Sequence, residues 1–378
     1  MLLLSTRSLD STLPPAKIAP NLSMQPQDST TKPSPCQYTT GKVLGRGTYA
    51  TVKEAFDKET GDVYACKIIN KHLMRGREYL VRNELDVLNK ISRSHPNIVT
   101  LEDYFESKHN IYLCFGLCNG GELFDRIGSW SHFYEADAAA LVRTILTTLN
   151  YIHASGIVHG DLKPENLLFQ SKGESTEIMI TDFGLSGILD EKMSLLTGVC
   201  GTPGYMAPEI FSKKGHSKPV DIWAVGVIAY YMLVGHPPFD RSTARLEQAA
   251  ILSGDLQFDT AEWAPVSMTA RDFVRACLTT DPARRPTAEQ ALKHAWLSSK
   301  TPCFVPDLFD PDGGPTDLLL HLKEMFRVQT KLICASNRHS SVTVPRIPNK
   351  CISNPSSHCR SSQGARPDLA SELGAPSQ

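Results

Sequence analysis

The spacing of apolar residues changes part-way along this chain of 378 residues. Up to about residue 118, short runs alternate apolar and polar side chains, a period of two that is typical of half-buried strands. These strand-like runs lie at 43–44, 51–55, 63–69, 98–105 and 111–117. Residues 78–91, in contrast, repeat apolar side chains at helical spacing. The first part of the chain is therefore predicted to be β-rich with one helix.

After Asn-Gly-Gly at 119–121, the pattern becomes helical. Apolar positions predict helices at 135–153, 219–234 and 269–278. We therefore expect an α+β fold of two lobes, a small β-rich lobe at 38–118 and a larger α-helical lobe at 119–297.

The two ends of the chain have a different composition. Residues 1–37 and 341–378 are rich in Ser, Thr, Pro and Gln, so they offer little to bury and are predicted to be a disordered arm and tail. Residues 298–340 lie between the second lobe and the tail, and they form a candidate regulatory segment.

Composition and charge exclude several classes of function. The formal net charge is −1, so no basic field points to a nucleic acid. No apolar stretch is long enough to insert into a membrane, and the N-terminus has no secretory signal. The ten cysteines are scattered without a zinc-site pattern. A protein of the cytoplasm, or of the nucleus, is expected.

A glycine-rich turn and a lysine in an apolar strand suggest a phosphate site. Gly45 and Gly47 let the backbone approach anionic oxygens, although Ala50 stands where a third glycine is usual. Lys67 follows within a strand-like run, and Glu84 on the next helix offers it a partner charge. Lys67 held by Glu84 could contact nucleotide phosphates, whereas a surface lysine and an ordinary glycine turn are the alternative interpretation.

The strongest chemical signal lies at residues 159–168 and 182–184. Asp161, Lys163 and Asn166 occur within six residues, and Asp182 follows in Asp-Phe-Gly. Together they supply a base, a cation and two metal ligands, which is the set that phosphoryl transfer needs. A chance polar loop would not explain the order of glycine loop, lysine, glutamate, catalytic loop, Asp-Phe-Gly and Ala-Pro-Glu at 207–209.

With these motifs in this order, residues 38–297 resemble a eukaryotic protein kinase domain. The resemblance is greatest to the Ca²⁺/calmodulin-dependent kinases, through Gly-Gly-Glu-Leu-Phe-Asp at 120–125 and Gly-Thr-Pro-Gly-Tyr-Met-Ala-Pro-Glu at 201–209. It implies a bilobal kinase fold and transfer of the ATP γ-phosphoryl group to serine or threonine of protein substrates. A pseudokinase scaffold and a small-molecule kinase are the alternatives, but both would be expected to lack some of these motifs.

The resemblance also implies residue roles, with ATP and Mg²⁺ as cofactors. Asp161 is the implied catalytic base and Lys163 the cation near the transferred phosphoryl group, while Asn166 and Asp182 match the metal-binding positions. Phe115 resembles the residue at the back of the adenine pocket, and Leu117 and Cys118 follow it in the hinge. The implied ATP-binding residues are Leu44, Gly45, Gly47, Val52, Ala65, Lys67, Glu84, Phe115, Leu117, Cys118 and Leu168.

Substrate contacts are implied in the same way. Glu122 and Glu165 match carboxylates that bind an arginine three residues before the target, although two solvated glutamates are the alternative. Thr202 could bridge Asp161 and Lys163. The apolar pocket for the residue after the target would be lined by Val199, Pro203 and Met206.

Two departures from the family pattern concern phosphorylation. Gly160 stands where most members carry an arginine that receives a phosphate on the activation segment, and Gly198 stands where relatives place the phosphorylated threonine. We therefore expect activity that does not require this phosphorylation, although Ser194 and Thr197 remain candidate acceptors.

The segment after the second lobe has the pattern of an amphipathic helix. Thr316 and Asp317 supply a helix start. Leu319, Phe326 and Leu332 then have the spacing of calmodulin anchors, and the resemblance implies an autoinhibitory helix that Ca²⁺/calmodulin releases. The alternative is a helix that only packs on the second lobe.

Overall fold

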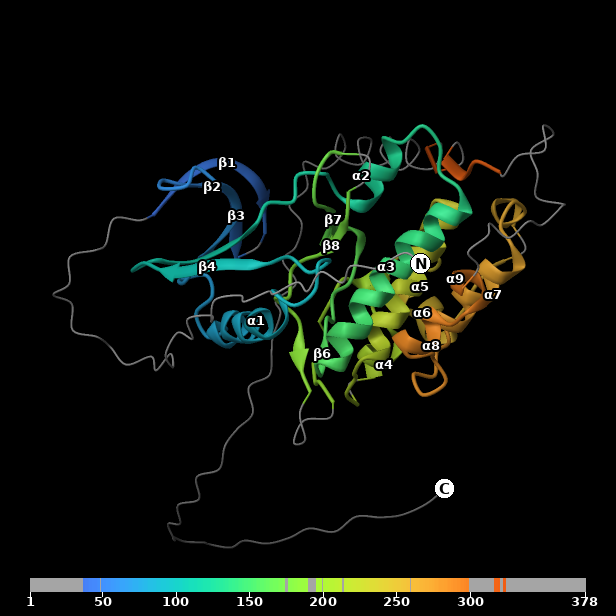
Figure 1. The fold of residues 1–378 in the computed structure, drawn as a ribbon. Coiled ribbons are helices and arrows are strands. Elements are labelled where there is room, and N and C mark those ends of the chain that lie inside the picture. Colours follow the sequence, from blue (N-terminus) through green and yellow to red (C-terminus); the bar gives the residue numbers. More distant parts are fainter. Residues whose placement is uncertain are drawn as a thin grey trace, which may run out of the picture. The chain divides into compact units, whose positions relative to one another are not determined.

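The computed structural model describes residues 37–298, with gaps at 48, 174–175, 190–194, 199, 213 and 259, and residues 316–319 and 322–323. Its first part is a five-stranded sheet, β1 (Tyr38–Arg46), β2 (Ala50–Asp57), β3 (Val63–Asn70), β4 (Leu101–Glu106) and β5 (Asn110–Gly116). The strand order is β1-β2-β3-β5-β4, and all neighbours are antiparallel. Helix α1 (Glu78–Ile91) lies next to this sheet (Figure 1).

The helical part begins after β5. Its helices are α2 (Leu123–Gly128), α3 (Glu135–Ala154), α4 (Pro208–Ser212), α5 (Pro219–Val234), α6 (Ala244–Ser253), α7 (Met268–Cys277), α8 (Ala288–Leu292) and α9 (Ala295–Ser298). Two short antiparallel strand pairs accompany them, β6 (Ile157–Val158) with β9 (Gly187–Ile188) and β7 (Leu167–Phe169) with β8 (Ile178–Ile180). Single 3₁₀ turns are η1 (Pro164–Asn166), η2 (Pro203–Tyr205) and η3 (Ala261–Trp263).

The predicted division into a β-rich and a helical part is confirmed. The helices expected at 78–91 and 219–234 have those bounds. The helix expected at 135–153 ends one residue later, and the one expected at 269–278 begins and ends one residue earlier. The strand expected at 98–105 begins only at Leu101, because Ile98 instead forms a single parallel bridge with Ile180 of β8.

Helix α5 organises the helical part. It is apolar on nearly every side and fourteen of its sixteen residues are buried, as expected of a helix enclosed by others. α3 runs beside it and α7 also contacts it (Figure 1). Asp221 is the one charged residue of this helix, and it is 1% exposed. Among the described residues, no helix is long and apolar enough to cross a bilayer.

Candidate active site

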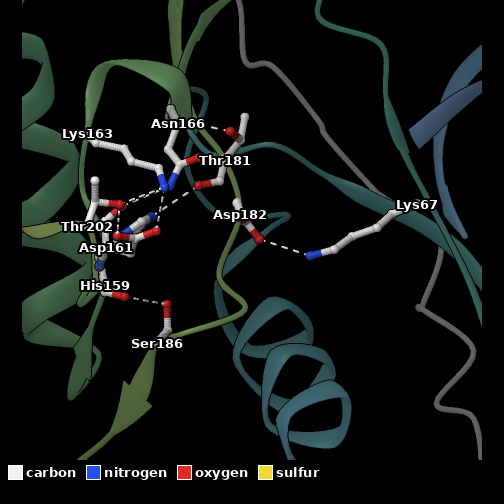
Figure 2. Close-up of polar contacts among 9 residues, drawn as sticks. All are labelled: Lys67, His159, Asp161, Lys163, Asn166, Thr181, Asp182, Ser186 and Thr202. Carbon is white, nitrogen blue, oxygen red and sulfur yellow. Dashed lines mark hydrogen bonds and ion pairs between the residues drawn. The ribbon is translucent and has the colours of Figure 1, made fainter. Parts of the chain in front are cut away.

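A triangle of polar side chains joins the catalytic loop, residues 159–168, to Thr202 at the start of η2 (Figure 2). Lys163 Nζ lies 2.9 Å from Asp161 Oδ2 and donates to Thr202 Oγ1 at 2.8 Å. Thr202 Oγ1 in turn donates to Asp161 Oδ1 at 2.9 Å. The predicted bridge by Thr202 is therefore present. A carboxylate, a cation and the start of the η2 turn are fixed against one another.

Asn166 is attached to the same loop. Its Nδ2 donates to the carbonyl oxygen of Asp161 at 2.8 Å, and its own carbonyl accepts from Thr181 N at 2.9 Å. Because Thr181 directly precedes Asp182, these contacts bring the two predicted metal ligands to one place (Figure 2). The amide oxygen of Asn166 is the side-chain atom left for a cation.

Asp221, on α5, accepts hydrogen bonds from the backbone of the catalytic loop. Its Oδ2 accepts from His159 N at 2.9 Å and from the His153 ring at 2.8 Å, and its Oδ1 accepts from Gly160 N at 2.9 Å. Burial acts to raise the pKa of Asp221, but the bonds from His153 and the loop outweigh it and lower the pKa. A buried carboxylate thus stays charged and fixes the loop that carries Asp161.

Lys67 on β3 reaches across to two carboxylates. Its Nζ lies 2.7 Å from Glu84 Oε1 on α1 and 2.9 Å from Asp182 Oδ1. Burial acts to lower the pKa of Lys67, but the charges of Glu84 and Asp182 outweigh it and raise the pKa above its ordinary value. The charge of Lys67 lowers the pKa of Asp182 in return. The predicted pairing of Lys67 with Glu84 is confirmed.

Asp182 has an unusual backbone. Its φ is 57°, in the left-handed region that a residue with a side chain seldom adopts. Strain of this kind persists where the surroundings enforce it, and it concentrates at functional sites. Here the ion pair with Lys67 and the bonds of the neighbouring Thr181 to Asn166 hold the residue in place.

The oxygen atoms at this point suit Mg²⁺. Asp182 and Asn166 offer one carboxylate and one amide oxygen, and Mg²⁺ typically takes one or two protein carboxylates together with waters and substrate phosphates. Within the described residues, no group of three or more His, Cys, Asp or Glu is arranged to hold a metal alone. The donor set therefore fits a metal that arrives with a nucleotide.

The predicted ATP-binding residues of the sheet lie in register across three strands. Val52 on β2 lies opposite Lys67 on β3, and Ala65 on β3 lies opposite Phe115 on β5. In β1, Gly45 pairs with Val52 and Leu44 is 41% exposed, while Gly47 closes the turn by donating to the Ala50 carbonyl at 2.8 Å.

The remaining predicted ATP-binding residues lie where the chain passes into the helical part. Leu117 and Cys118 follow β5 directly. Burial raises the pKa of the Cys118 thiol to about 11, so it stays neutral. Leu168 lies in β7 and forms an antiparallel bridge with Glu122. The predicted ATP-binding residues thus come from β1 and the turn after it, β2, β3, α1, β5, the chain after β5, and β7.

The two predicted acidic specificity residues are close enough to influence each other. Partial burial of the Glu122 carboxyl, and then the charges of Asp125 and Glu165, raise its pKa. Glu165 is exposed on η1, beside the catalytic loop. An exposed negative site therefore flanks Asp161.

We call the segment from Thr202 to Glu209 the substrate shelf, and it is anchored at its far end. Pro203 is exposed on η2 and Met206 is 5% exposed behind it, whereas Val199 lies outside the described residues. Arg285 donates from Nη1 and Nη2 to the two carboxylate oxygens of Glu209, at 2.8 and 3.1 Å. This ion pair at the end of the segment is largely covered, with the Arg285 side chain 0% and the Glu209 side chain 10% exposed.

The start of the C-terminal segment is docked on the helical part. Phe133 N donates to Asp317 Oδ1 and Leu318 N donates to the Phe133 carbonyl, at 2.9 and 2.8 Å. Leu318, Leu319 and Leu322 are 2%, 1% and 0% exposed. Leu319, predicted as a calmodulin anchor, is therefore covered by the protein itself, while Phe326 and Leu332 lie outside the described residues.

Sequence reasoning missed the supporting role of Asp221 and its partner His153. The signal was available, because a lone aspartate in a helix that is apolar all round must be satisfied by buried donors. Its partners could not be inferred, since His153 and His159 lie more than sixty residues away in the sequence.

Comparison with known proteins decides the family. The model of the protein kinase domain matches residues 38–297. The chain belongs to the protein kinase family. This kinase is 50% identical to calcium/calmodulin-dependent protein kinase cmkB of Emericella nidulans, over 325 residues that cover 85% of this chain and 78% of that protein.

Two further relatives have similar names. The calcium/calmodulin-dependent protein kinase type I of Schizosaccharomyces pombe is 50% identical over 80% of this kinase and 88% of that protein. Type 1B of Homo sapiens is 46% identical over 68% and 74%. The predicted fold and the serine/threonine protein kinase class are confirmed, and the scaffold alternative has no support.

Proposed function

We propose that this kinase phosphorylates proteins at a serine or threonine preceded by arginine, with Asp161 as catalytic base, and that a C-terminal segment makes it responsive to Ca²⁺/calmodulin. The observation that carries the proposal is the triangle of Asp161, Lys163 and Thr202. It joins the base, a cation and the substrate shelf in one contact set, so a hydroxyl placed on the shelf would meet the carboxylate directly.

The chemistry follows from these positions. Asp161 accepts the proton of the substrate hydroxyl while the oxygen of that hydroxyl forms a bond to the γ-phosphorus. The bond from the γ-phosphorus to the leaving ADP oxygen breaks. Lys163, held beside Asp161, stabilises negative charge on the transferred group. Lys67, fixed by Glu84, holds the nucleotide phosphates.

Mg²⁺ would be held by Asp182 and Asn166, where it neutralises charge on the phosphates. Both residues are kept in place by this chain's own contacts. Asn166 is tied to the Asp161 carbonyl, and Asp182 lies against Lys67. The two ligands are thus prepared for the metal by the loop and by β3.

A direct test is phosphate transfer from ATP to a serine peptide by the purified chain. Asp161→Ala and Asp182→Asn should each lower kcat by at least about 100-fold, because each removes a charge placed for the transition state. Asp272→Asn is the matched control, since this exposed carboxylate of α7 pairs with Arg275 of the same helix. Near wild-type turnover of Asp161→Ala would contradict the assignment of the base.

Arginine preference rests on Glu122 and Glu165. Their carboxylates interact and lie beside the catalytic loop, where a guanidinium could pair with both. A peptide library should show enrichment of arginine, above lysine, three residues before the target. Glu122→Gln should reduce this enrichment, whereas no enrichment in the wild type would remove the proposal.

Calmodulin regulation is supported by the names of the relatives and by the amphipathic pattern after Asp317. Because Leu319 is covered in the docked segment, its use as an anchor would require that residues 317–322 leave the helical part. The test compares the full chain with a truncation after Lys300, each assayed with Ca²⁺ alone and with Ca²⁺/calmodulin. Autoinhibition predicts higher basal activity for the truncation and stimulation of the full chain alone. Equal, calmodulin-insensitive activities would leave the segment as packing.

A further inference from the structure

Among the described residues between β9 and the substrate shelf, Leu196 is held by two backbone bonds. Leu196 N donates to the His216 carbonyl at 2.8 Å, and His216 N donates to the Leu196 carbonyl at 3.0 Å. This exchange is an antiparallel bridge, although neither residue belongs to a longer strand. Leu196 lies six residues before Thr202, so the bridge fixes the segment just ahead of the shelf.

The side chain of Leu196 fills space that Gly187 leaves open. A Cβ placed on Gly187 would overlap Cγ, Cδ1 and Cδ2 of Leu196. Leu196 is partly buried and packs against the main hydrophobic core. The neighbouring Leu195, in contrast, is 47% exposed. The contact between Leu196 and Gly187 is therefore an apolar plug set into β9.

Both partners of Leu196 lead directly to the catalytic loop. Gly187 pairs with Val158 of β6, and β6 runs into His159 and Asp161. His216 lies just before α5, whose Asp221 accepts the backbone bonds from the loop. Leu196 thus joins the shelf segment to the two elements that position Asp161.

Several positions around this plug are glycines, which offer no side chain to an anion. Gly160 and Gly187 have no side chains, and Gly198 has a φ of 124°, a backbone that suits glycine. Thr197 is exposed. The described contacts of the segment at Leu196 are apolar packing and backbone bonds.

We propose that Leu196 is a positioning residue. Its plug in β9 and its bridge to His216 hold the shelf beside Asp161, so that turnover does not depend on a phosphate in residues 190–200. The inference rests on the proposed role of Asp161 and adds what orders the shelf around it.

The first experiment compares Leu196→Ala with Leu195→Ala in the full chain. Each protein is treated with a phosphatase, checked by mass for the absence of phosphate, and assayed with and without Ca²⁺/calmodulin. Leu196→Ala should lower kcat/KM for the peptide at least about tenfold, and leave KM for ATP within about twofold of wild type. Leu195→Ala should stay within about twofold throughout, and Leu196→Met should restore most of the activity.

The second experiment is a double-mutant cycle with Gly187. Gly187→Ala alone should lower peptide turnover, because its Cβ displaces Leu196. In the Leu196→Ala background the same change has room, so the double variant should be no worse than Leu196→Ala. Additive losses would show that the two positions act separately, and they would contradict the proposal that the contact between Leu196 and Gly187 holds the shelf.

The outcomes separate this inference from the proposed function. An inactive wild type in every assay would contradict the kinase assignment itself. An active wild type with an equally active Leu196→Ala would overturn the role of Leu196. Loss of wild-type activity on phosphatase treatment, with recovery only when Thr197 is phosphorylated and no activity in Thr197→Ala, would overturn phosphate independence. The proposal is supported if the phosphate-free wild type retains its activity while Leu196→Ala and Gly187→Ala lose peptide turnover as predicted.

Discussion

Asp317 should control how firmly the C-terminal segment is docked. One oxygen of its carboxylate accepts from Phe133 N and from Leu319 N, both at 2.9 Å, so the same side chain tethers the segment and caps its first turn. Asp317→Ala removes both bonds. Each bond is worth about 1 kcal/mol, so the docked state should lose about 2 kcal/mol. That loss corresponds to a shift of roughly 30-fold in the local opening equilibrium.

Amide hydrogen exchange measures this opening directly. The amide of Leu318 donates to the Phe133 carbonyl and becomes free only when the segment undocks. Peptides that cover residues 316–323 should therefore exchange about 10- to 30-fold faster in Asp317→Ala than in wild type. The buried leucines keep most molecules docked, so global stability should change little.

Lys323→Ala is the matched control. Lys323 is exposed and its Nζ donates to the Trp130 carbonyl at 3.2 Å, so its loss should change exchange by less than about threefold. Asp317→Asn should fall between the two, because asparagine still caps a helix but lacks the charge. Exchange in Asp317→Ala that stays within twofold of wild type would refute the idea that this carboxylate holds the segment.

Three further outcomes follow from the site. Lys67→Met should lower kcat by about 100-fold or more with an unchanged circular dichroism spectrum, because it removes the cation paired with Glu84; full activity would contradict that role. Burial and nearby charges raise the pKa of Glu122, so its carboxylate takes up a proton at a higher pH than an ordinary glutamate. The preference for arginine over alanine peptides should therefore fall as pH drops from 7 to 5, and this fall should vanish in Glu122→Gln. Arg285→Leu leaves the Glu209 carboxylate buried without its partner, so the free energy of unfolding should drop by about 3–5 kcal/mol; a melting temperature equal to wild type would contradict this.

Local patterns were sufficient for much of the fold. The helices at 78–91 and 219–234 could be located because apolar spacing along a helix is a property of neighbouring residues. The order of motifs likewise placed Asp161 and Asp182 in one site. The strand predicted from 98 began later, since Ile98 pairs with β8, a strand some eighty residues further on.

Contacts between distant segments explain what the sequence could not supply. The spacing of Leu319, Phe326 and Leu332 suggests a free amphipathic face. In the structure, Leu319 is buried, because Asp317 meets Phe133 from 184 positions away. Periodicity shows that a face is apolar, but it does not show what covers that face. The same limit applies to Leu196, because its contact partner, Gly187, has no side chain that could indicate the contact in the sequence.

Gly160 has two physical consequences, of which the sequence reveals one. The absence of a charged side chain can be inferred from the residue itself. The structure adds that the backbone at this position is left-handed, with a φ of 78°, and that a Cβ would lie 3.0 Å from the Leu185 carbonyl oxygen. Glycine adopts this conformation without strain, and Gly160 N still donates to Asp221. The backbone support of Asp161 is therefore kept although the side chain at 160 is lost, and a cation at this position is not needed to hold the loop in place.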